Sequence, residues 1–214
     1  MSATAAKSGV ATIRILMVGV GGQGVLTAGR VIGEAALAAN LDVRVGQLHG
    51  MSQRGGSVET TVVIGAGESA FVGAGTCDLL LALEPLEALR AAPRLRPGAT
   101  VWLSTARIVP GTVGAVDKPY PSLSEIEALL TARGAQVHTV NATDLAASAG
   151  DAKAVSAFML GMLIGAGSLP IDEELFDKTV SAFSPARSRE TTLRAYRLGV
   201  ALQRKESGGG LGTA

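Results

Sequence analysis

The architecture of the chain is set by residues 13–24, which read IRILMVGVGGQG. The first part, Ile13 to Gly19, is an apolar run with one arginine, which is typical of a strand buried on both faces of a mainly parallel sheet. The glycines of Gly19-Val-Gly-Gly-Gln-Gly24 then match the spacing of a phosphate-binding turn between a strand and a helix. Residues 23–39 contain many small side chains and are expected to form that helix, packed closely on the sheet.

The rest of the chain continues this alternation. The expected strands cover residues 41–48, 57–64, 78–83, 99–104 and 136–140. The expected helices cover residues 85–95, 122–134, 143–149, 152–166, 173–183 and 186–204. A short strand near 69–72 is expected to form an antiparallel hairpin with 57–64. The pattern predicts an α/β fold: a Rossmann-like, three-layer, doubly wound and mostly parallel sheet with an antiparallel hairpin and a helical C-terminal segment.

We expect one domain over residues 13–204, with disordered tails at 1–12 and 205–214. The formal net charge of the 214 residues is +1 and aromatic residues make up 3%, which disfavours nucleic-acid and anionic-membrane partners. No apolar run reaches the roughly 18 residues of a membrane span, and the first residues lack a signal-peptide core. These features predict a cytoplasmic protein.

The chain contains a single cysteine, Cys77, and only two histidines, His49 and His138. One thiol supports neither an internal disulfide nor an iron–sulfur cluster, which takes about four thiolates. We therefore expect no metal site and a buried, unreactive Cys77 on a strand. Glu84, just before Pro85, is expected to cap the following helix, and the segment Ser122-Leu-Ser-Glu125 is a capping box.

The glycine turn leaves three interpretations open. Its backbone N–H groups can contact an anion or a cofactor, its glycines can serve only close helix–sheet packing, or it can bind NAD. Binding of NAD requires an acidic residue at the end of the second strand, about 20 residues further on. Residues 45–48 there read VGQL, and Asp42 lies at the opposite end of the strand.

A second candidate segment, His49-Gly-Met-Ser-Gln-Arg-Gly-Gly56, leaves the carboxyl end of the second strand, beside the glycine turn. Ligands collect at this edge of doubly wound sheets. The segment contains no complete catalytic set, because no third group orients a base near its serine and histidine. The candidate binding residues of the two segments are Gly19, Gly21, Gly22, Gln23, Gly24, His49, Met51, Ser52, Gln53, Arg54 and Gly55.

Five segments together resemble a known family: residues 19–25 (GVGGQGV), 49–58 (HGMSQRGGSV), 81–88 (LALEPLEA), 118–122 (KPYPS) and 141–144 (NATD). They are similar to the beta subunits of indolepyruvate ferredoxin oxidoreductases, within the wider group of gamma subunits or domains of 2-oxoacid:ferredoxin oxidoreductases. The resemblance covers residues 13–201, and residues 49–56 are its most specific part.

The resemblance implies an enzyme that oxidatively decarboxylates indolepyruvate and other aryl pyruvates to acyl-coenzyme A. Thiamine diphosphate with magnesium and [4Fe-4S] clusters are expected on a large alpha subunit, which passes electrons to ferredoxin. The present chain is then a subunit without a cofactor of its own, inactive alone, that covers the active site and helps to bind coenzyme A. Two other functions stay open: a stand-alone dinucleotide-binding reductase, and a non-enzymatic binding protein of the same fold.

Overall fold

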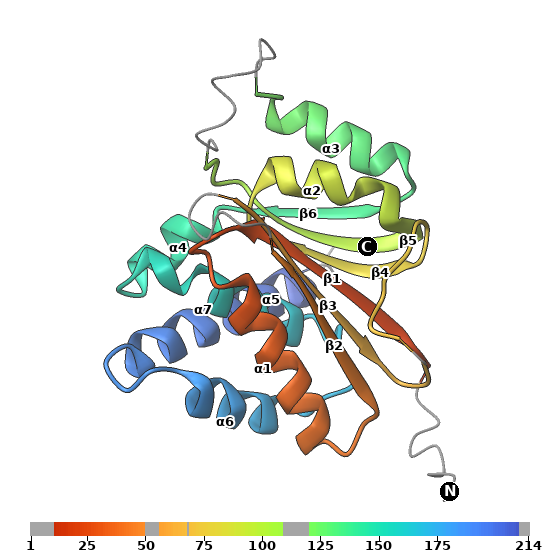
Figure 1. Cartoon of the computed structure of the whole chain (residues 1–214). Coiled ribbons are helices and arrows are strands. Elements are labelled where there is room, and N and C mark those ends of the chain that lie inside the picture. Colours follow the sequence, from red (N-terminus) through yellow and green to blue (C-terminus); the bar gives the residue numbers. More distant parts are fainter. Residues whose placement is uncertain (1–10, 50–55, 68, 109–119, 210–214) are drawn as a thin grey trace, which may run out of the picture.

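A computed structural model describes residues 11–49, 56–67, 69–108 and 120–209. Its centre is a six-stranded sheet in the order β2-β3-β1-β4-β5-β6, with helices on both faces (Figure 1). The strands are β1 (Ile13–Val20), β2 (Val43–His49), β3 (Ser57–Ile64), β4 (Cys77–Ala82), β5 (Leu95–Ser104) and β6 (Gln136–Val140). The helices are α1 (Val25–Ala38), α2 (Pro85–Ala91), α3 (Leu123–Ala132), α4 (Ala142–Ser148), α5 (Val155–Gly165), α6 (Glu173–Phe183) and α7 (Arg189–Gly209), with 3-10 turns at Ala92–Arg94 and Ala152–Ala154.

The sheet is parallel except at β3, which lies between β1 and β2 and is antiparallel to both. The expected α/β fold with a mostly parallel sheet and an antiparallel hairpin is therefore confirmed, but the hairpin is formed by β2 and β3. The prediction of a strand near 69–72 was wrong, because residues 69–72 form no strand. The segment instead lies against one face of the hairpin, where the carbonyl oxygen of Val72 accepts a hydrogen bond of 2.8 Å from Arg94.

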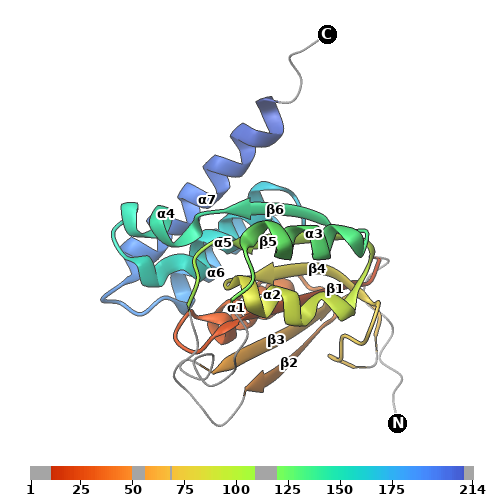
Figure 2. The same ribbon diagram turned by 90° about the horizontal axis from the view of Figure 1, so that it is seen from above.

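The connections that follow β1 and β4 cross opposite faces of the sheet. Helix α1 follows β1 and joins α4, α5, α6 and α7 in the larger of two hydrophobic cores. Helix α2 follows the neighbouring strand β4 and packs with α3 on the other face (Figures 1 and 2). Strands β1 and β4 therefore form the topological switch point of the sheet. In such folds the crevice at the carboxyl ends of these strands is the usual ligand site.

Local sequence signals place most helix ends. Ser122 and Glu125 form the expected capping box of α3, and the side chain of Asp172 accepts a hydrogen bond from the backbone of α6. Helix α2 ends at Ala91, earlier than expected, because Pro93 cannot continue the helical hydrogen bonds. Helix α7 continues five residues past the expected domain end to Gly209 and projects from the body (Figure 2). Within the described ranges, no helix is both long and apolar enough to span a bilayer.

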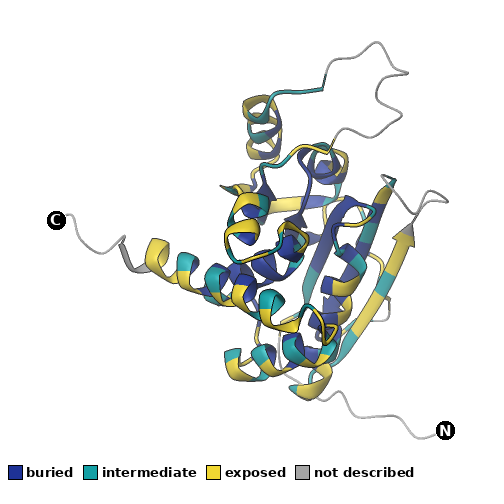
Figure 3. Cartoon of the chain, turned by 90° about the vertical axis from the view of Figure 1, so that its left-hand side faces the viewer, coloured by how far each residue is buried: buried dark blue, intermediate teal, exposed yellow. Residues whose placement is uncertain are grey.

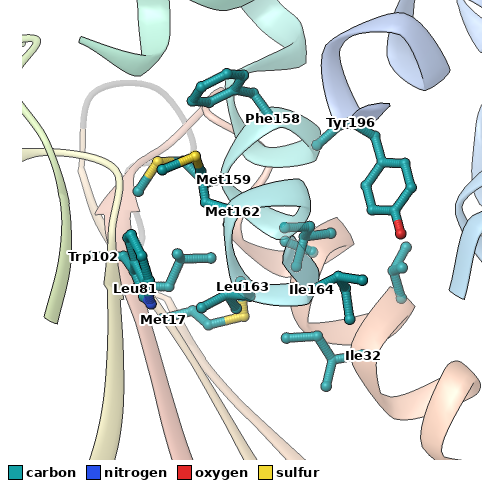
Figure 4. Packing of buried hydrophobic residues seen from close by; sticks show 14 of the residues in the cluster. Met17, Ile32, Leu81, Trp102, Phe158, Met159, Met162, Leu163, Ile164 and Tyr196 are labelled. Carbon is teal, nitrogen blue, oxygen red and sulfur yellow. The ribbon is translucent and has the colours of Figure 1, made fainter. Parts of the chain in front are cut away.

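Helix α5 lies in the middle of the larger core, between the sheet and helices α1 and α7 (Figure 4). Its side chains are buried on all sides, as in Phe158, Met159 and Leu163. Glycines allow α5 and α7 to approach closely. A Cβ atom added at Gly161 would lie 2.0 Å from the carbonyl oxygen of Tyr196, and one at Gly199 would lie 2.2 Å from that of Phe158. Strand residue Cys77 is fully buried, as expected.

We expect Gly161→Ala to lower the free energy of unfolding by about 2 kcal/mol or more, because the added methyl group overlaps backbone atoms that cannot move independently. Intrinsic helix propensity acts in the opposite direction, since alanine is favoured over glycine by about 1 kcal/mol. The reverse change at the exposed α7 position, Ala201→Gly, should cost only about that propensity difference. Urea unfolding followed by circular dichroism measures both. A Gly161→Ala chain as stable as the parent would contradict the close packing of α5 on α7.

Candidate functional site

The glycine turn after β1 forms the start of the site. Gly22 and Gly24 have φ angles of +103° and +83°, which side chains on other residues rarely allow. Helix α1 begins directly after Gly24 without a side-chain cap. A Cβ atom at Gly24 would lie 2.6 Å from the hydroxyl oxygen of Ser156 on α5, whereas one at Gly22 would meet no atom of the described residues within 4 Å. The turn therefore presents open backbone at Gly22 and uncapped N–H groups of α1, an arrangement that suits an anionic group.

Gln23 holds this turn to the neighbouring strand. Its side chain is 6% exposed. The amide nitrogen Nε2 donates a 2.7 Å hydrogen bond to the carbonyl oxygen of Leu83, and the backbone N–H of Val20 donates a 2.8 Å bond to Oε1. Gly19 makes room for this side chain, since a Cβ atom there would lie 2.7 Å from Oε1 of Gln23. Both polar groups of Gln23 are thus used inside the protein, and its predicted contact with a ligand stays a prediction.

The structure brings the ends of the second candidate segment to the same place. His49 is the last residue of β2, and Ser57, the first residue of β3, is opposite Val20. The backbone N–H of Gly21 donates a 2.9 Å hydrogen bond to the carbonyl oxygen of Gly56. The candidate residues Met51, Ser52, Gln53, Arg54 and Gly55 lie outside the described residues, as does the side chain of His49. Their binding role stays a prediction, supported by the position of the two flanking strands.

A buried carboxylate, Glu84, occupies the carboxyl end of β4 and is fully buried. Its Oε2 atom accepts a 3.1 Å hydrogen bond from the N–H of Glu87, so the expected helix-capping role is confirmed. Its Oε1 atom accepts hydrogen bonds from the hydroxyl of Tyr120 and, at 3.3 Å, from the N–H of Ile108. The Tyr120 oxygen in turn accepts a 3.1 Å bond from the N–H of Leu86. Glu84 therefore fixes the two chain segments that flank residues 109–119.

A second buried carboxylate, Glu87, is 2% exposed and connects α2 to β3. The Ser57 hydroxyl donates a 2.6 Å hydrogen bond to its Oε2 atom, and Arg90 pairs with its Oε1 atom. Sequence analysis missed Glu87, Ser57 and Tyr120 as site residues. The available signal was the spacing of two acids at the start of one helix, Glu84 and Glu87, since the first turn of a helix favours carboxylates.

The arrangement is suited to holding backbone in place rather than to acid–base catalysis. Both carboxylates have donors inside the protein, and burial together with the hydrogen bond to Glu84 raises the pKa of Tyr120. Among the described residues, no group of three or more His, Cys, Asp or Glu side chains could hold a metal ion. His138 lies on the edge strand β6, where its ring stacks on Trp102 at 4.5 Å between centroids.

Comparison with known sequences identifies the class. Residues 14–202 match the family described as pyruvate ferredoxin/flavodoxin oxidoreductase, and the chain belongs to this family. Indolepyruvate oxidoreductase subunit IorB of Methanothermobacter thermautotrophicus is 37% identical over 86% of this chain and 94% of its own length. Subunit IorB of Archaeoglobus fulgidus is 38% identical over 87% of this chain and 93% of its own. The chain is thus a small subunit of the indolepyruvate type, and the resemblance of its motifs is confirmed.

Solved structures share the fold. The gamma subunit of the keto/oxoacid ferredoxin oxidoreductase of Geobacter sulfurreducens has a TM-score of 0.66 at 23% identity, covering 90% of this chain and 98% of that one. Subunit PORC of the Thermotoga maritima pyruvate oxidoreductase has a TM-score of 0.67 at 21% identity, covering 89% and 96%. At these identities the likeness establishes the architecture alone.

We expect Gln23→Ala to lower the free energy of unfolding by about 2–4 kcal/mol, because it leaves the buried N–H of Val20 and the carbonyl of Leu83 without partners. Gln136→Ala, at an exposed position on β6, is the matched control and should change stability by less than about 0.5 kcal/mol. Chemical denaturation compares the two. Equal stability of both variants would show that Gln23 is not the tie between β1 and β4.

We expect the stability of the chain to fall as the pH rises above 10, and Tyr120→Phe to make this fall shallower. Folding raises the pKa of Tyr120 above its ordinary value of 10.0. The protonated Tyr120 therefore contributes fully to the free energy of unfolding below pH 10, and this contribution is lost as the pH rises towards the folded pKa. Tyr196 and Cys77 have pKa values raised by burial and remain in the variant, so part of the fall persists. Urea unfolding at pH 9 to 11 measures the slope, and identical slopes would contradict the assignment.

Proposed function

We propose that this chain is the small subunit of an indolepyruvate or aryl-pyruvate ferredoxin oxidoreductase, which oxidatively decarboxylates its substrate to an acyl-coenzyme A. In this proposal a large alpha subunit carries the thiamine diphosphate and the [4Fe-4S] clusters, and ferredoxin accepts the electrons. The observation that carries the proposal is the match to relatives named as IorB subunits, which extends over 86–87% of this chain and 93–94% of theirs.

The residues of this chain do not fit the redox cofactors. A [4Fe-4S] cluster takes about four thiolates, and the chain has one cysteine. Cys77 is fully buried, so its thiol is not accessible to a cluster. Burial also raises its pKa to about 12, so the thiol is not ionised near neutral pH. Thiamine diphosphate supplies the chemistry that cleaves the bond next to the keto carbon of a 2-oxoacid. That chemistry then belongs to the partner subunit.

The contribution of this chain is a rigid rim at the carboxyl edge of the sheet. The open backbone at Gly22 and the uncapped start of α1 suit a phosphate group, as coenzyme A carries. Gln23 holds the turn from its buried side, and Glu84 and Glu87 hold the neighbouring chain segments. Because these groups are already held by buried hydrogen bonds, ordering them costs little free energy when a ligand binds at the rim.

Two observations disfavour the stand-alone dinucleotide reductase. The Gln23 side chain bridges the carboxyl ends of β1 and β4, where the pyrophosphate of a dinucleotide approaches most closely in this fold class. The end of β2, which should offer a carboxylate to the ribose, reads Gln47, Leu48 and His49. The non-enzymatic binding protein is disfavoured by the family match over residues 14–202.

The function is tested by co-expression with the large subunit encoded in the same organism. We expect a brown complex that contains iron and thiamine diphosphate and reduces ferredoxin when indolepyruvate and coenzyme A are supplied. The chain purified alone should be colourless, inactive and without affinity for NADH. Iron analysis, absorbance spectra and anaerobic assays measure these outcomes. Stoichiometric iron or thiamine on the chain alone, or turnover of 2-oxoacids by it, would refute the proposal.

The rim is tested in the same complex with Arg54→Ala, a change in the segment between β2 and β3. If this segment helps to bind coenzyme A, the KM for coenzyme A should rise about tenfold while the KM for indolepyruvate stays near its original value, as for one lost phosphate contact. The control is Arg133→Ala, at the exposed end of α3 and away from this edge of the sheet. Equal constants for both variants would remove the segment from the coenzyme A site but leave the subunit assignment intact.

A further inference from the structure

The edge strand β2 has unpaired hydrogen-bonding groups along its outer side. Among the described strands it pairs only with β3. The N–H of Gly65 donates a 2.8 Å hydrogen bond to the carbonyl of Asp42, its partner when the register is extended by one residue. In an antiparallel pair bonded residues alternate, so Arg44, Gly46 and Leu48 bond to β3 and the odd-numbered residues of β2 direct their N–H and C=O groups outward. Such an edge is a ready template for another strand.

Exposed apolar side chains gather on both faces of this edge. Six large apolar residues are exposed in the described chain, and four of them lie here: Leu37 (60%), Val45 (40%), Leu48 (62%) and Phe71 (70%). Leu37 and Val45 line a hollow of about 390 Å³ between α1 and β2. Leu48 and Phe71 line a second hollow of about 230 Å³ on the opposite face. The exposed strand is visible along one side of the molecule in Figure 3.

The strand is complementary to itself. When β2 pairs antiparallel with a second β2 across a two-fold axis at Gly46, all seven residues of each strand overlap. In this register Val45 is opposite Gln47 of the second copy. The outward N–H and C=O groups of the two strands can then form the hydrogen bonds of an antiparallel pair. Gly46 then faces Gly46 of the second copy in a non-hydrogen-bonded pair, where strands approach most closely and the absence of a side chain is favourable.

Helix α1 fits the same axis. Gly33 packs over the middle of β2, since a Cβ atom there would lie 2.6 Å from Cγ2 of Val45. The exposed side chains of Arg30 and Glu34 lie on either side of this point and form a loose ion pair at 3.9 Å, and the Arg30 guanidinium also lies 4.9 Å from the centre of the Phe183 ring. If the two-fold axis also passes beside Gly33, it reverses the direction of α1 and directs Arg30 towards Glu34 of the second copy. The charges of this surface are therefore complementary under the rotation that also pairs the strands.

We propose that β2 is the dimer interface of this chain, with a second copy as the occupant and a continuous sheet running through both copies. The exposed apolar residues and the two hollows then become buried between the copies. This inference does not depend on the proposed enzymatic function, because it concerns only the association of the chain with itself.

The test compares the full chain with two matched variants, Leu48→Lys and Leu129→Lys. Leu48 lies opposite Arg44 of the second copy, so a lysine there places like charges directly across the interface. Leu129 is a similarly exposed leucine on α3, on the other side of the molecule. In light scattering after gel filtration, the parent chain and Leu129→Lys should be dimers. The dissociation constant of Leu48→Lys should be at least about tenfold higher. A monomeric parent chain, or equal dimerisation of both variants, would overturn the proposal.

A disulfide tests the register. Arg44 and Leu48 of the second copy form a non-hydrogen-bonded pair, so Arg44→Cys combined with Leu48→Cys should give a covalent dimer on mild oxidation. Arg44→Cys alone is the control, because the two Arg44 positions are about 13 Å apart along the strands, beyond the reach of about 7 Å between Cα atoms in a disulfide. Cross-linking of the single variant alone, or of neither, would refute the register. A monomeric parent chain whose Leu48→Lys variant fails to bind the large subunit would assign β2 to that subunit instead.

Discussion

The hydrogen bonds of one buried glutamine side chain hold the functional edge of this molecule together. Gln23 receives the N–H of Val20 at the end of β1 and donates to the carbonyl of Leu83 at the end of β4, so it joins the two strands where the helices begin to cover opposite faces of the sheet. At a switch point the strand ends diverge and leave backbone groups without partners in the sheet. A side chain that carries both a donor group and an acceptor group satisfies one backbone group on each strand. The glycine turn is thereby fixed without any ligand.

The buried acids extend this arrangement outward from the switch point. A carboxylate removed from water is stable only when donors replace its hydration. Glu84 obtains them from the backbone of α2, from Ile108 and from Tyr120, and Glu87 obtains them from Ser57 and Arg90. Each acid is therefore committed to particular neighbours, and these neighbours belong to chain segments that enter the site. Burial makes these carboxylates specific structural ties and leaves them unsuited to general acid–base chemistry.

The sequence predicted those parts of the fold that depend on local patterns. Strand β3, strand β6 and helix α6 have the expected bounds, because alternation, Gly134 and the Asp172 cap are all signals within a few residues. The position of β3 between β1 and β2 was not predictable in this way, because strand order depends on contacts between distant segments. The apolar alternation of β3 is equally consistent with a hairpin on either side of it.

The difference between local patterns and contacts of distant segments also separates the predicted parts of the site from the missed ones. The glycine turn is recognisable from the spacing of its glycines, but the structural role of Gln23 depends on Leu83, 60 residues away. The pairing of Ser57 with Glu87, 30 residues apart, is likewise absent from any local pattern. A residue within a ligand-binding motif is naturally assigned to the ligand when its distant protein partner is unknown. For Gln23 the structure supplies that partner, and the side chain stabilises the site from inside.

Two edges of this subunit differ in how far their polar and apolar groups are already engaged within the protein. Its carboxyl edge is pre-formed by buried hydrogen bonds, whereas its β2 edge leaves backbone groups and apolar side chains open. These two surfaces meet at His49, where β2 ends beside the glycine turn. An association along β2 would therefore involve the strand end that lies beside the glycine turn. If both proposals hold, ligand contact at the glycine turn and association along β2 use two surfaces that share the end of one strand.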